Sequence, residues 1–194
     1  MRNPIRPKNL SRRFAPWYAA GLLLVWISHP SVASVSAGLL PVVLGLSIRT
    51  WGAGHLVKNE RFTVTGPYAY LRHPLYLGTI LIAVGFGSML GGWPALAALS
   101  VALAWFFLDY FPRKEKVEGE RLQSRYGDVY ARYRGAVPAL WPRLRRWRPA
   151  PADAEKLDIR HHWSVACYDR NNELGTLLAV TLAGLGLVLW AVFQ

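Results

Sequence analysis

The sequence predicts an all-α, polytopic membrane protein with about five transmembrane helices. The chain has 194 residues, of which 53% are apolar, and these residues are gathered into blocks rather than spread along the sequence. The five blocks contain no Lys, Arg or Glu, and Asp109 is their only acid. Because the rest of the chain is too small to bury so much apolar surface, we interpret each block as a membrane-crossing helix. The blocks are residues 14–27, 31–48, 75–90, 94–111 and 174–193.

The first four blocks are expected to form two tight hairpins. His29-Pro30 separates the first block from the second, and Gly91-Gly92-Trp93-Pro94 separates the third from the fourth. Proline and paired glycines favour turns. A bilayer crossing needs roughly 17–25 residues, so the first and third blocks are short, and the first also fits a buried soluble helix. The polar segment 52–71 is expected to fold as a loop over the cytoplasmic mouth of the bundle.

The segment between the fourth and fifth blocks divides into three parts. Residues 114–134 predict a cytoplasmic amphipathic helix, because apolar residues recur every three or four positions among charges. Residues 141–154 are rich in proline and arginine and predict a linker or a surface-lying strip, whose Trp and Arg residues would form an interfacial belt. Residues 158–168 predict a second interfacial helix. We therefore divide the chain into a membrane core, residues 1–142, and a C-terminal part, residues 143–194, made of the basic linker, the interfacial segment and the last transmembrane helix.

The basic residues predict the orientation of the chain in the membrane. Five Lys and Arg precede the first block, four lie between the second and third, and fourteen lie between the fourth and fifth, whereas the other loops hold none. Basic residues on alternate loops predict a cytoplasmic N-terminus by the positive-inside rule. The net charge of +12 then needs no nucleic acid, because basic flanks also attract anionic lipid. We expect a multi-pass protein of a bacterial-type inner membrane, with membrane lipids and no nucleic acid as partners.

The segment GPYAYLRHPLYLG, residues 66–78, is the most informative about function. It contains Arg72-His73-Pro74-Leu75-Tyr76-Leu77-Gly78 and leads into the third block. HLVKNE precedes it from residue 55, and Glu118 and then LQSRYGDVYARY, residues 122–133, follow it. In this order these four short motifs resemble the isoprenylcysteine carboxyl methyltransferase family of integral membrane enzymes. The signature of that family is RHPxYxG, a membrane hairpin, a glutamate-rich helix and LxxxFGxxYxxY, and the resemblance covers roughly residues 45–142.

The resemblance implies S-adenosylmethionine as the cofactor, bound among membrane helices and the loops at their cytoplasmic ends. A carboxylate such as Glu118 can pair with the ammonium group of the cofactor, and Tyr68 and Tyr76 can offer hydroxyl groups or ring faces. His73 precedes a proline that fixes a helix start, so it is placed to hydrogen-bond there, and Arg72 shares its positioning role. The cofactor residues that the resemblance implies are Lys58, Thr63, Val64, Tyr68, His73, Pro74, Leu75, Tyr76 and Glu118.

The resemblance also points to Lys114, with Arg113 beside it, as binding residues for a lipophilic or lipid-modified acceptor. A carboxylate acceptor is already ionised at neutral pH, so it needs a cationic clamp, alignment and a dry pocket rather than a general base. We favour this O-methylation. An amine acceptor, as in phospholipid N-methylation, would need a proton removed, and Glu115 or Asp109 would become the candidate base.

Two other classes of function stay open. Sterol reductases are similar in having an Arg-His motif before a membrane helix and a tyrosine-glycine segment near the C-terminus. A nicotinamide-dependent membrane reductase is therefore the second hypothesis. A non-catalytic membrane partner or lipid-binding protein on the same scaffold is the third, and it predicts that neither cofactor binds.

The remaining polar and small residues are interpreted as structural. The chain has one cysteine, Cys167, which excludes an internal disulfide, and with His161-His162 alone it lacks the ligands of a metal site. We therefore expect no metal. Gly184-Leu185-Gly186 is expected to let a neighbouring helix approach closely, and Asn171-Asn172-Glu173 is expected to cap the last helix.

Overall fold

Every regular element in the described part of the chain is helical, which confirms the predicted all-α class. The structure is a computed structural model, and it describes residues 15–57, 61–154, 157 and 159–193. Two elements depart from α geometry: η3 is a 3₁₀ turn and η4 is π-helical. The elements are α1 (Ala15–Ile27), α2 (Val32–His55), η3 (Gly66–Ala69), α3 (Pro74–Leu90), α4 (Gly92–Trp105), η4 (Phe106–Tyr110), α5 (Phe111–Ala136), α6 (Pro151–Ala154), α7 (Val165–Arg170) and α8 (Glu173–Phe193).

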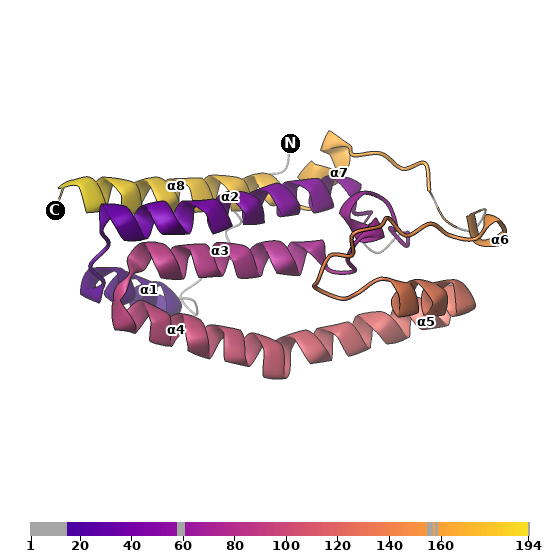
Figure 1. The fold of residues 1–194 in the computed structure, drawn as a ribbon, viewed down its shortest axis with the longest axis horizontal. Helices are drawn as coiled ribbons and strands as arrows, with labels where there is room; N and C mark the ends of the chain where they lie inside the picture. Colours follow the sequence, from indigo (N-terminus) through magenta and orange to yellow (C-terminus); the bar gives the residue numbers. More distant parts are fainter. Residues whose placement is uncertain (1–14, 58–60, 155–156, 158, 194) are drawn as a thin grey trace.

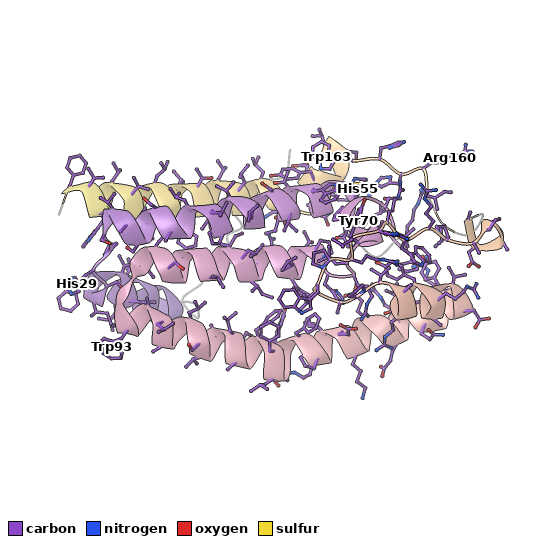
Figure 2. All side chains as sticks on the ribbon, viewed as in Figure 1. His29, His55, Tyr70, Trp93, Arg160 and Trp163 are labelled. Carbon is purple, nitrogen blue, oxygen red and sulfur yellow. The ribbon has the colours of Figure 1, made fainter. Side chains whose placement is uncertain are left out.

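Four long helices lie side by side in the order α8, α2, α3 and α4 (Figure 1). α2 and α3 run in opposite directions, and α4 continues through η4 into α5. One end of the bundle carries the turns from α1 to α2 and from α3 to α4, where His29 and Trp93 lie (Figure 2). The other end, which we call the polar end, carries the α2–α3 connection, α6 and α7, with His55, Tyr70 and Trp163.

Three helices of the described residues are long and apolar enough to cross a membrane: α2, the continuous α4–η4–α5 helix, and α8. The apolar part of the continuous helix ends at Phe111, and the charged residues that follow favour a position outside the membrane for the rest of α5. α3 has 17 residues and α1 has 13. At 1.5 Å per residue they extend about 25 and 20 Å, less than the ~30 Å hydrocarbon core. The protein is thus an integral membrane protein, and five crossings stay a prediction.

Local sequence explains where the bundle helices begin. Ser31 and Ser34 form a reciprocal capping box at the start of α2, with hydrogen bonds of 3.1 and 2.9 Å between each backbone N–H and the other hydroxyl. Gly91 and Gly92 have φ of +66° and +73°, so the predicted glycine turn separates α3 from α4. α1, in contrast to the expected hairpin with α2, has its main contact with α4.

The contact between α2 and α3 depends on glycine. A Cβ atom at Gly45 would lie 2.6 Å from the carbonyl oxygen of Gly78, and one at Gly38 would lie 2.3 Å from that of Gly85. Real Cβ atoms do not approach oxygen so closely, so only glycine allows the two backbones to come into contact there. Gly78 closes the 66–78 motif, and its role is therefore to set α3 against α2.

An ion pair and the apolar packing around Leu187, rather than small residues, hold α8 against α2. Arg49 Nη2 and Nε donate to the two carboxylate oxygens of Glu173 at 2.6 and 3.0 Å. α8 begins at Glu173 as expected, but the buried carboxylate of this residue binds Arg49 of α2 instead of capping α8. A Cβ atom at Gly184 or Gly186 would meet nothing within 4 Å, so the close approach expected there is absent within the described chain.

The residues before α8 close the polar end of α2. Asn171 Nδ2 donates to the carbonyl oxygens of Ala53 and Leu56, both at 2.9 Å, instead of capping α8 as expected. Trp163 Nε1 donates to the carbonyl oxygen of Thr50 at 3.0 Å. The last carbonyl groups of a helix lack donors within the helix, so the Asn171 side chain satisfies those of Ala53 and of the cap residue Leu56. The C-terminal part is therefore hydrogen-bonded to the end of α2.

The predicted helix over residues 158–168 is shorter and later than expected. α7 begins at Val165, because Ser164 caps it: Cys167 N donates to Ser164 Oγ at 3.2 Å. Residue 158 lies outside the described residues.

The predicted amphipathic helix is broken in the middle. Gly127 has φ 51° and ψ −126°, a conformation that favours glycine. It divides α5 into two arms, residues 111–126 and 128–136, and the second arm folds back on the first (Figure 1). A Cβ atom at Gly119 would lie 3.3 Å from Tyr130 Oη, which shows how closely the arms pack.

A small hydrophobic core forms at the polar end. The ring of Phe62 lies edge-on to Tyr133 with centroids 5.0 Å apart, and Tyr133 lies 5.1 Å from Trp147 in the same manner. This core joins the α2–α3 connection, the second arm of α5 and the C-terminal part, so motif residues from all three border a common space. Its buried members are Phe62, Val64, Val129, Tyr130, Tyr133, Val137, Trp147 and Leu157.

Candidate active site

The motif of residues 66–78 leaves the His73 ring available at the start of α3. Gly66 opens it with φ +59°, and a Cβ atom there would lie 2.3 Å from His55 Cδ2, so glycine is required on both counts. His73 is the N-cap of α3 and Pro74 is its first residue, as the Arg-His-Pro sequence predicts. The His73 side chain makes no capping hydrogen bond to the helix. It points instead to a partner on α5.

Backbone hydrogen bonds fix the connection before α3 against the chain that follows α5. Four bonds join residues 69–73 to residues 138–147, although these two stretches lie far apart in the sequence. They hold the Arg-His pair in position from the backbone. The bonds run from Arg72 N to Pro138 O (2.9 Å), His73 N to Ala139 O (3.0 Å), Arg143 N to Tyr70 O (3.0 Å) and Trp147 N to Ala69 O (2.9 Å).

Glu115, on the first arm of α5, binds both side chains of the Arg-His pair. Its Oε1 accepts a hydrogen bond from Arg72 Nη1, and its Oε2 lies 3.4 Å from His73 Nε2. The hydrogen bond with His73, and then the charge of Arg72, lower the pKa of Glu115 to about 2 against the opposing effect of burial. Glu115 is therefore an anion across the neutral range and a weak base.

A cavity of about 570 Å³ lies at the polar end, between the α2–α3 connection, the start of α3 and α5. Its volume is within the roughly 300–1,000 Å³ of small-molecule sites. Residues far apart in the sequence, from Leu56 to Tyr133, line it together. The predicted site residues in its wall are Thr63, Tyr68, Arg72, His73, Pro74, Leu75, Tyr76, Lys114 and Glu118.

Two predicted site residues of the described chain lie elsewhere. Val64 is buried in the hydrophobic core of the polar end. Arg113 forms an ion pair with Asp109 on an exposed side of the helix, and neither residue lines the cavity. Lys58 falls outside the described residues.

Glu118 presents a half-buried carboxylate to the cavity. Among the described residues it has no hydrogen bond or ion pair. Burial, and then the neighbouring Tyr133 and Glu118, raise the pKa of Tyr68, so this tyrosine stays a neutral hydroxyl group. A carboxylate that is partly removed from water and has no cationic partner is suited to bind a cationic group of a ligand.

Tyr76 and Tyr110 line the cavity, and the ring of Phe111 packs against Tyr76. The ring centroid of Tyr76 lies 6.1 Å from that of Tyr110 and 5.8 Å from that of Phe111. Lys114 Nζ lies 5.7 Å from the centroid of Tyr110. The backbone N–H of Phe111 donates to Phe106 O, five residues back, so η4 shifts the phase of the helix just before these side chains.

Sequence reasoning missed several residues of the wall. A signal was present for Tyr130 and Tyr133, because tyrosines three positions apart share one face of a helix. Tyr133 Oη donates to Tyr68 O at 2.7 Å and so joins the two motifs directly. For Tyr110 there was no local signal, because its direction depends on the π-helical turn. The missed residues include Arg61, Phe62, Tyr110, Arg121, Tyr130 and Tyr133.

A second, more open hollow of about 730 Å³ lies on the opposite face of α5. Glu115 borders it, but no predicted cofactor or acceptor residue does, so the smaller cavity is the candidate site. In the described part of the chain, no three His, Cys, Asp or Glu side chains are grouped so that they could hold a metal ion. Cys167 Sγ and His161 Nε2 lie 3.7 Å apart, and the described residues add no third such group.

Known proteins resemble the segment that builds this cavity. A sequence model of the isoprenylcysteine carboxyl methyltransferase family matches residues 49–118. A cobalt-zinc-cadmium resistance protein of Cupriavidus metallidurans is 32% identical over 116 residues, which cover 59% of this chain and 51% of that protein. A nickel-cobalt-cadmium resistance protein of Alcaligenes xylosoxydans is 32% identical over 125 residues, or 63% and 55%. A protein-S-isoprenylcysteine O-methyltransferase of Schizosaccharomyces pombe is 34% identical over 93 residues, or 45% and 38%.

These likenesses cover part of each protein. The chain spans about half the length of the two resistance proteins and 38% of the Schizosaccharomyces pombe enzyme. No solved structure matches it. The matched residues 49–118 run from the last turns of α2 to the first arm of α5 and contain both the Arg-His-Pro motif and Glu118. Through this segment, the chain is similar to the isoprenylcysteine carboxyl methyltransferase family.

Proposed function

We propose that the protein is an S-adenosylmethionine-dependent methyltransferase of the membrane that methylates a lipophilic acceptor. The family match and the Schizosaccharomyces pombe relative, whose name is that of an O-methyltransferase, support this reaction class. One observation carries the proposal: the Glu118 carboxylate, without a partner among the described residues, borders the same cavity as His73 and the first turn of α3.

The cofactor would be held between α5 and the start of α3. Glu118 would pair with its ammonium group, and the N-terminus of α3, a 17-residue helix, would favour its carboxylate. Tyr68 and Tyr76 line the cavity and would contact the sugar, the adenine or the sulfonium group. When bound, S-adenosylmethionine supplies an electrophilic methyl group. Thr63, Pro74 and Leu75 complete the wall, and roles for Lys58 and Val64 rest on the family resemblance alone.

The charges of the cavity favour an anionic acceptor. Four basic side chains line it, of which Arg72 is paired with Glu115, and Glu118 is the only acid among the described residues of its wall. A carboxylate acceptor is ionised at neutral pH, so this basic wall would attract and orient it without a general base. Lys114 is the predicted clamp, and it lines the cavity beside the Tyr110 ring. The other basic residues are Arg61, Arg72 and Arg121.

Neither predicted candidate base for an amine acceptor is placed to serve as one. Glu115 is bound to Arg72 and His73, and these contacts hold its pKa at about 2. Asp109 lies outside the cavity and pairs with Arg113. We therefore favour O-methylation of a carboxylate over N-methylation of a lipid amine.

The lipophilic part of the acceptor would enter from the bilayer and the cofactor from the cytoplasm, with the N-terminus also cytoplasmic. We propose a bacterial inner membrane as the setting. Two relatives are named for metal resistance and one for isoprenylcysteine O-methylation, so these names point to no single acceptor. We propose only its class, a lipophilic carboxylate that is free or attached to a protein.

Binding of radiolabelled S-adenosylmethionine to the purified full-length protein tests the cofactor assignment. Wild type is expected to bind, and Glu118→Gln is expected to weaken binding at least about tenfold, because it removes a charge-assisted hydrogen bond. His73→Ala is expected to weaken it as well. Glu120→Gln, two positions away on an exposed side of the same arm, is the matched control and should bind normally. Failure of the wild type to bind would overturn the proposal.

Two further measurements separate the alternative functions. A rise in melting temperature with NADPH, and none with S-adenosylmethionine, would favour a nicotinamide-dependent reductase. Mass spectrometry of lipids from cells with and without the protein is expected to show species that gain one methyl group on a carboxylate. A methyl group gained on a lipid amine would replace O-methylation by N-methylation.

A further inference from the structure

Residues 141–148, which we call the Trp-Arg strip, expose large apolar side chains beside basic ones. Trp141 is 80% exposed and Leu144 is 99% exposed. Three arginines of the strip are exposed as well, and none of them has a hydrogen bond or ion pair with a described residue. Neighbouring exposed apolar side chains of this size mark a surface that contacts something other than water. The three arginines are Arg145, Arg146 and Arg148.

The backbone of the strip is held in place against the α2–α3 connection. Arg143 N donates to Tyr70 O at 3.0 Å, and Trp147 N donates to Ala69 O at 2.9 Å. The Trp147 side chain is buried and lies edge-on to the ring of Tyr133, with centroids 5.1 Å apart. Trp147 therefore anchors the strip, while the residues around it face away from the protein.

These contacts place the strip at the boundary of the membrane. The apolar helices α2 and α3 end and begin at His55 and Pro74, so the residues bonded to the strip lie where the bundle leaves the bilayer. Trp51 and Trp163, 44% and 42% exposed, belong to the same polar end, where Figure 2 labels Trp163. Tryptophan is enriched at the level of lipid headgroups.

We propose that the Trp-Arg strip is a docking surface for anionic phospholipid of the membrane that holds the protein. Its arginines would bind headgroup phosphates, because a guanidinium group matches two phosphate oxygens at once. Trp141 and Leu144 would insert between the headgroups. Charge complementarity selects this occupant, since the strip contains four arginines and no acid. A basic residue at an anionic surface gives about a fivefold preference. This surface is independent of the proposed methyl transfer.

Native mass spectrometry of the full-length protein, released from nanodiscs with equal parts of phosphatidylglycerol and phosphatidylcholine, tests the proposal. Wild type is expected to retain phosphatidylglycerol in excess. The triple variant R145Q/R146Q/R148Q is expected to retain at least about tenfold less of it. The control variant K116Q/R125Q/R134Q removes the same charge from exposed positions of α5 and should retain it as the wild type does.

A second variant keeps the arginines and removes the inserted side chains. W141A/L144A is expected to lose at least half of the retained phosphatidylglycerol, and both side chains are exposed, so the fold should be unchanged. Equal retention of the two lipids by the wild type would overturn the proposal. An equal loss of retained phosphatidylglycerol in the strip triple variant and in the α5 control variant would overturn it as well. The strip would then be interpreted as a contact for a soluble acidic partner.

Discussion

At the scale of single residues, Glu115 determines how the Arg-His pair is arranged. Its carboxylate binds both Arg72 and His73, so the two side chains hold one orientation at the cavity wall. A buried ion pair adds little net stability, but removing one partner is costly because the other charge is left buried and alone. Glu115 is therefore a positioning residue, although its sequence context suggested only a candidate base.

The variant Glu115→Gln should destabilise the protein by about 3 kcal/mol at neutral pH, because it removes the anionic partner of Arg72. The pKa of Glu115 is lowered to about 2 in the fold from 4.5, so its contribution is fully present above pH 4.5. It is lost as the pH falls from 4.5 toward 2. Thermal unfolding in detergent from pH 7 to pH 3 checks this: wild type should lose stability in the acid range more steeply than the variant.

The control for that measurement is Glu120→Gln, which changes an exposed carboxylate of the same arm. It should follow the wild-type curve. Parallel curves for the wild type and Glu115→Gln would contradict the assigned contact.

The residues of the site were predictable where the motif is local. His73 and Tyr76 lie in one continuous segment, and Glu118 was assigned from the family resemblance. All three residues line the cavity. The partner of Arg72 was not predictable, because Glu115 lies 43 positions away and reaches it only through the path of α5. Tyr110 was missed because a regular helix from the fourth block would give it another direction.

At the scale of helices, the glycine contact between α2 and α3 sets the geometry of the cavity. Gly45 of α2 opposes Gly78 of α3, which lies only five residues after His73, the N-cap of α3. Any increase in the α2–α3 distance would move the start of α3 relative to the loop that follows α2. The contact therefore helps to fix the position of His73 at the start of α3.

The variant Gly45→Ala should destabilise the protein by about 1–3 kcal/mol, because its Cβ would meet the Gly78 carbonyl oxygen at 2.6 Å. It should also weaken cofactor binding. Gly184→Ala is the matched control, since a Cβ there meets nothing within 4 Å. Melting temperatures in the same detergent compare the two, and an equal change in both variants would contradict the role of the contact.

The sequence predicted the helices better than their breaks. Apolar blocks and the Gly91-Gly92 turn indicated α2, α3, α4 and α8, because a membrane helix is defined by a continuous apolar run. The fold-back of α5 was missed, since the apolar period continues through Gly127 and only its backbone angles reveal the break. The expected packing at Gly184-Leu185-Gly186 failed because small residues permit a close contact without requiring one.

At the scale of the whole molecule, the two ends of the bundle differ in chemistry. The turns 28–31 and 91–93 contain no Lys or Arg, whereas the polar end carries the cavity and the Trp-Arg strip. By the positive-inside rule the polar end would face the cytoplasm, where a soluble cofactor is available. The fold and the charge pattern therefore favour the same orientation.

Cysteine labelling in intact cells tests that orientation. In a Cys167→Ser background, Trp93→Cys should react with a membrane-impermeant maleimide from outside, because Trp93 is 79% exposed in a turn at the end opposite the cavity. Gln123→Cys, exposed on α5, should react only after the cells are opened. The reverse pattern, or labelling of both from outside, would contradict a cytoplasmic cavity.

The membrane class of the whole protein was predictable from composition, but the role of its last fifty residues was not. The linker expected after residue 142 forms backbone hydrogen bonds with the α2–α3 connection, and Asn171 and Glu173 bind the end of α2. These partners are distant in sequence and follow no short motif. Only the packed fold brings them together.

The π-helical turn makes the site sensitive to chain length rather than to residue type. η4 holds an extra residue, so the faces of α4 and α5 are offset by one position. Excising Leu108, whose side chain is 82% exposed, would restore regular winding and rotate all that follows by about 100°. The side chains of Lys114 and Glu118 would then both leave the cavity wall, while α4 kept its position. A compensating insertion a few positions later would bring both back.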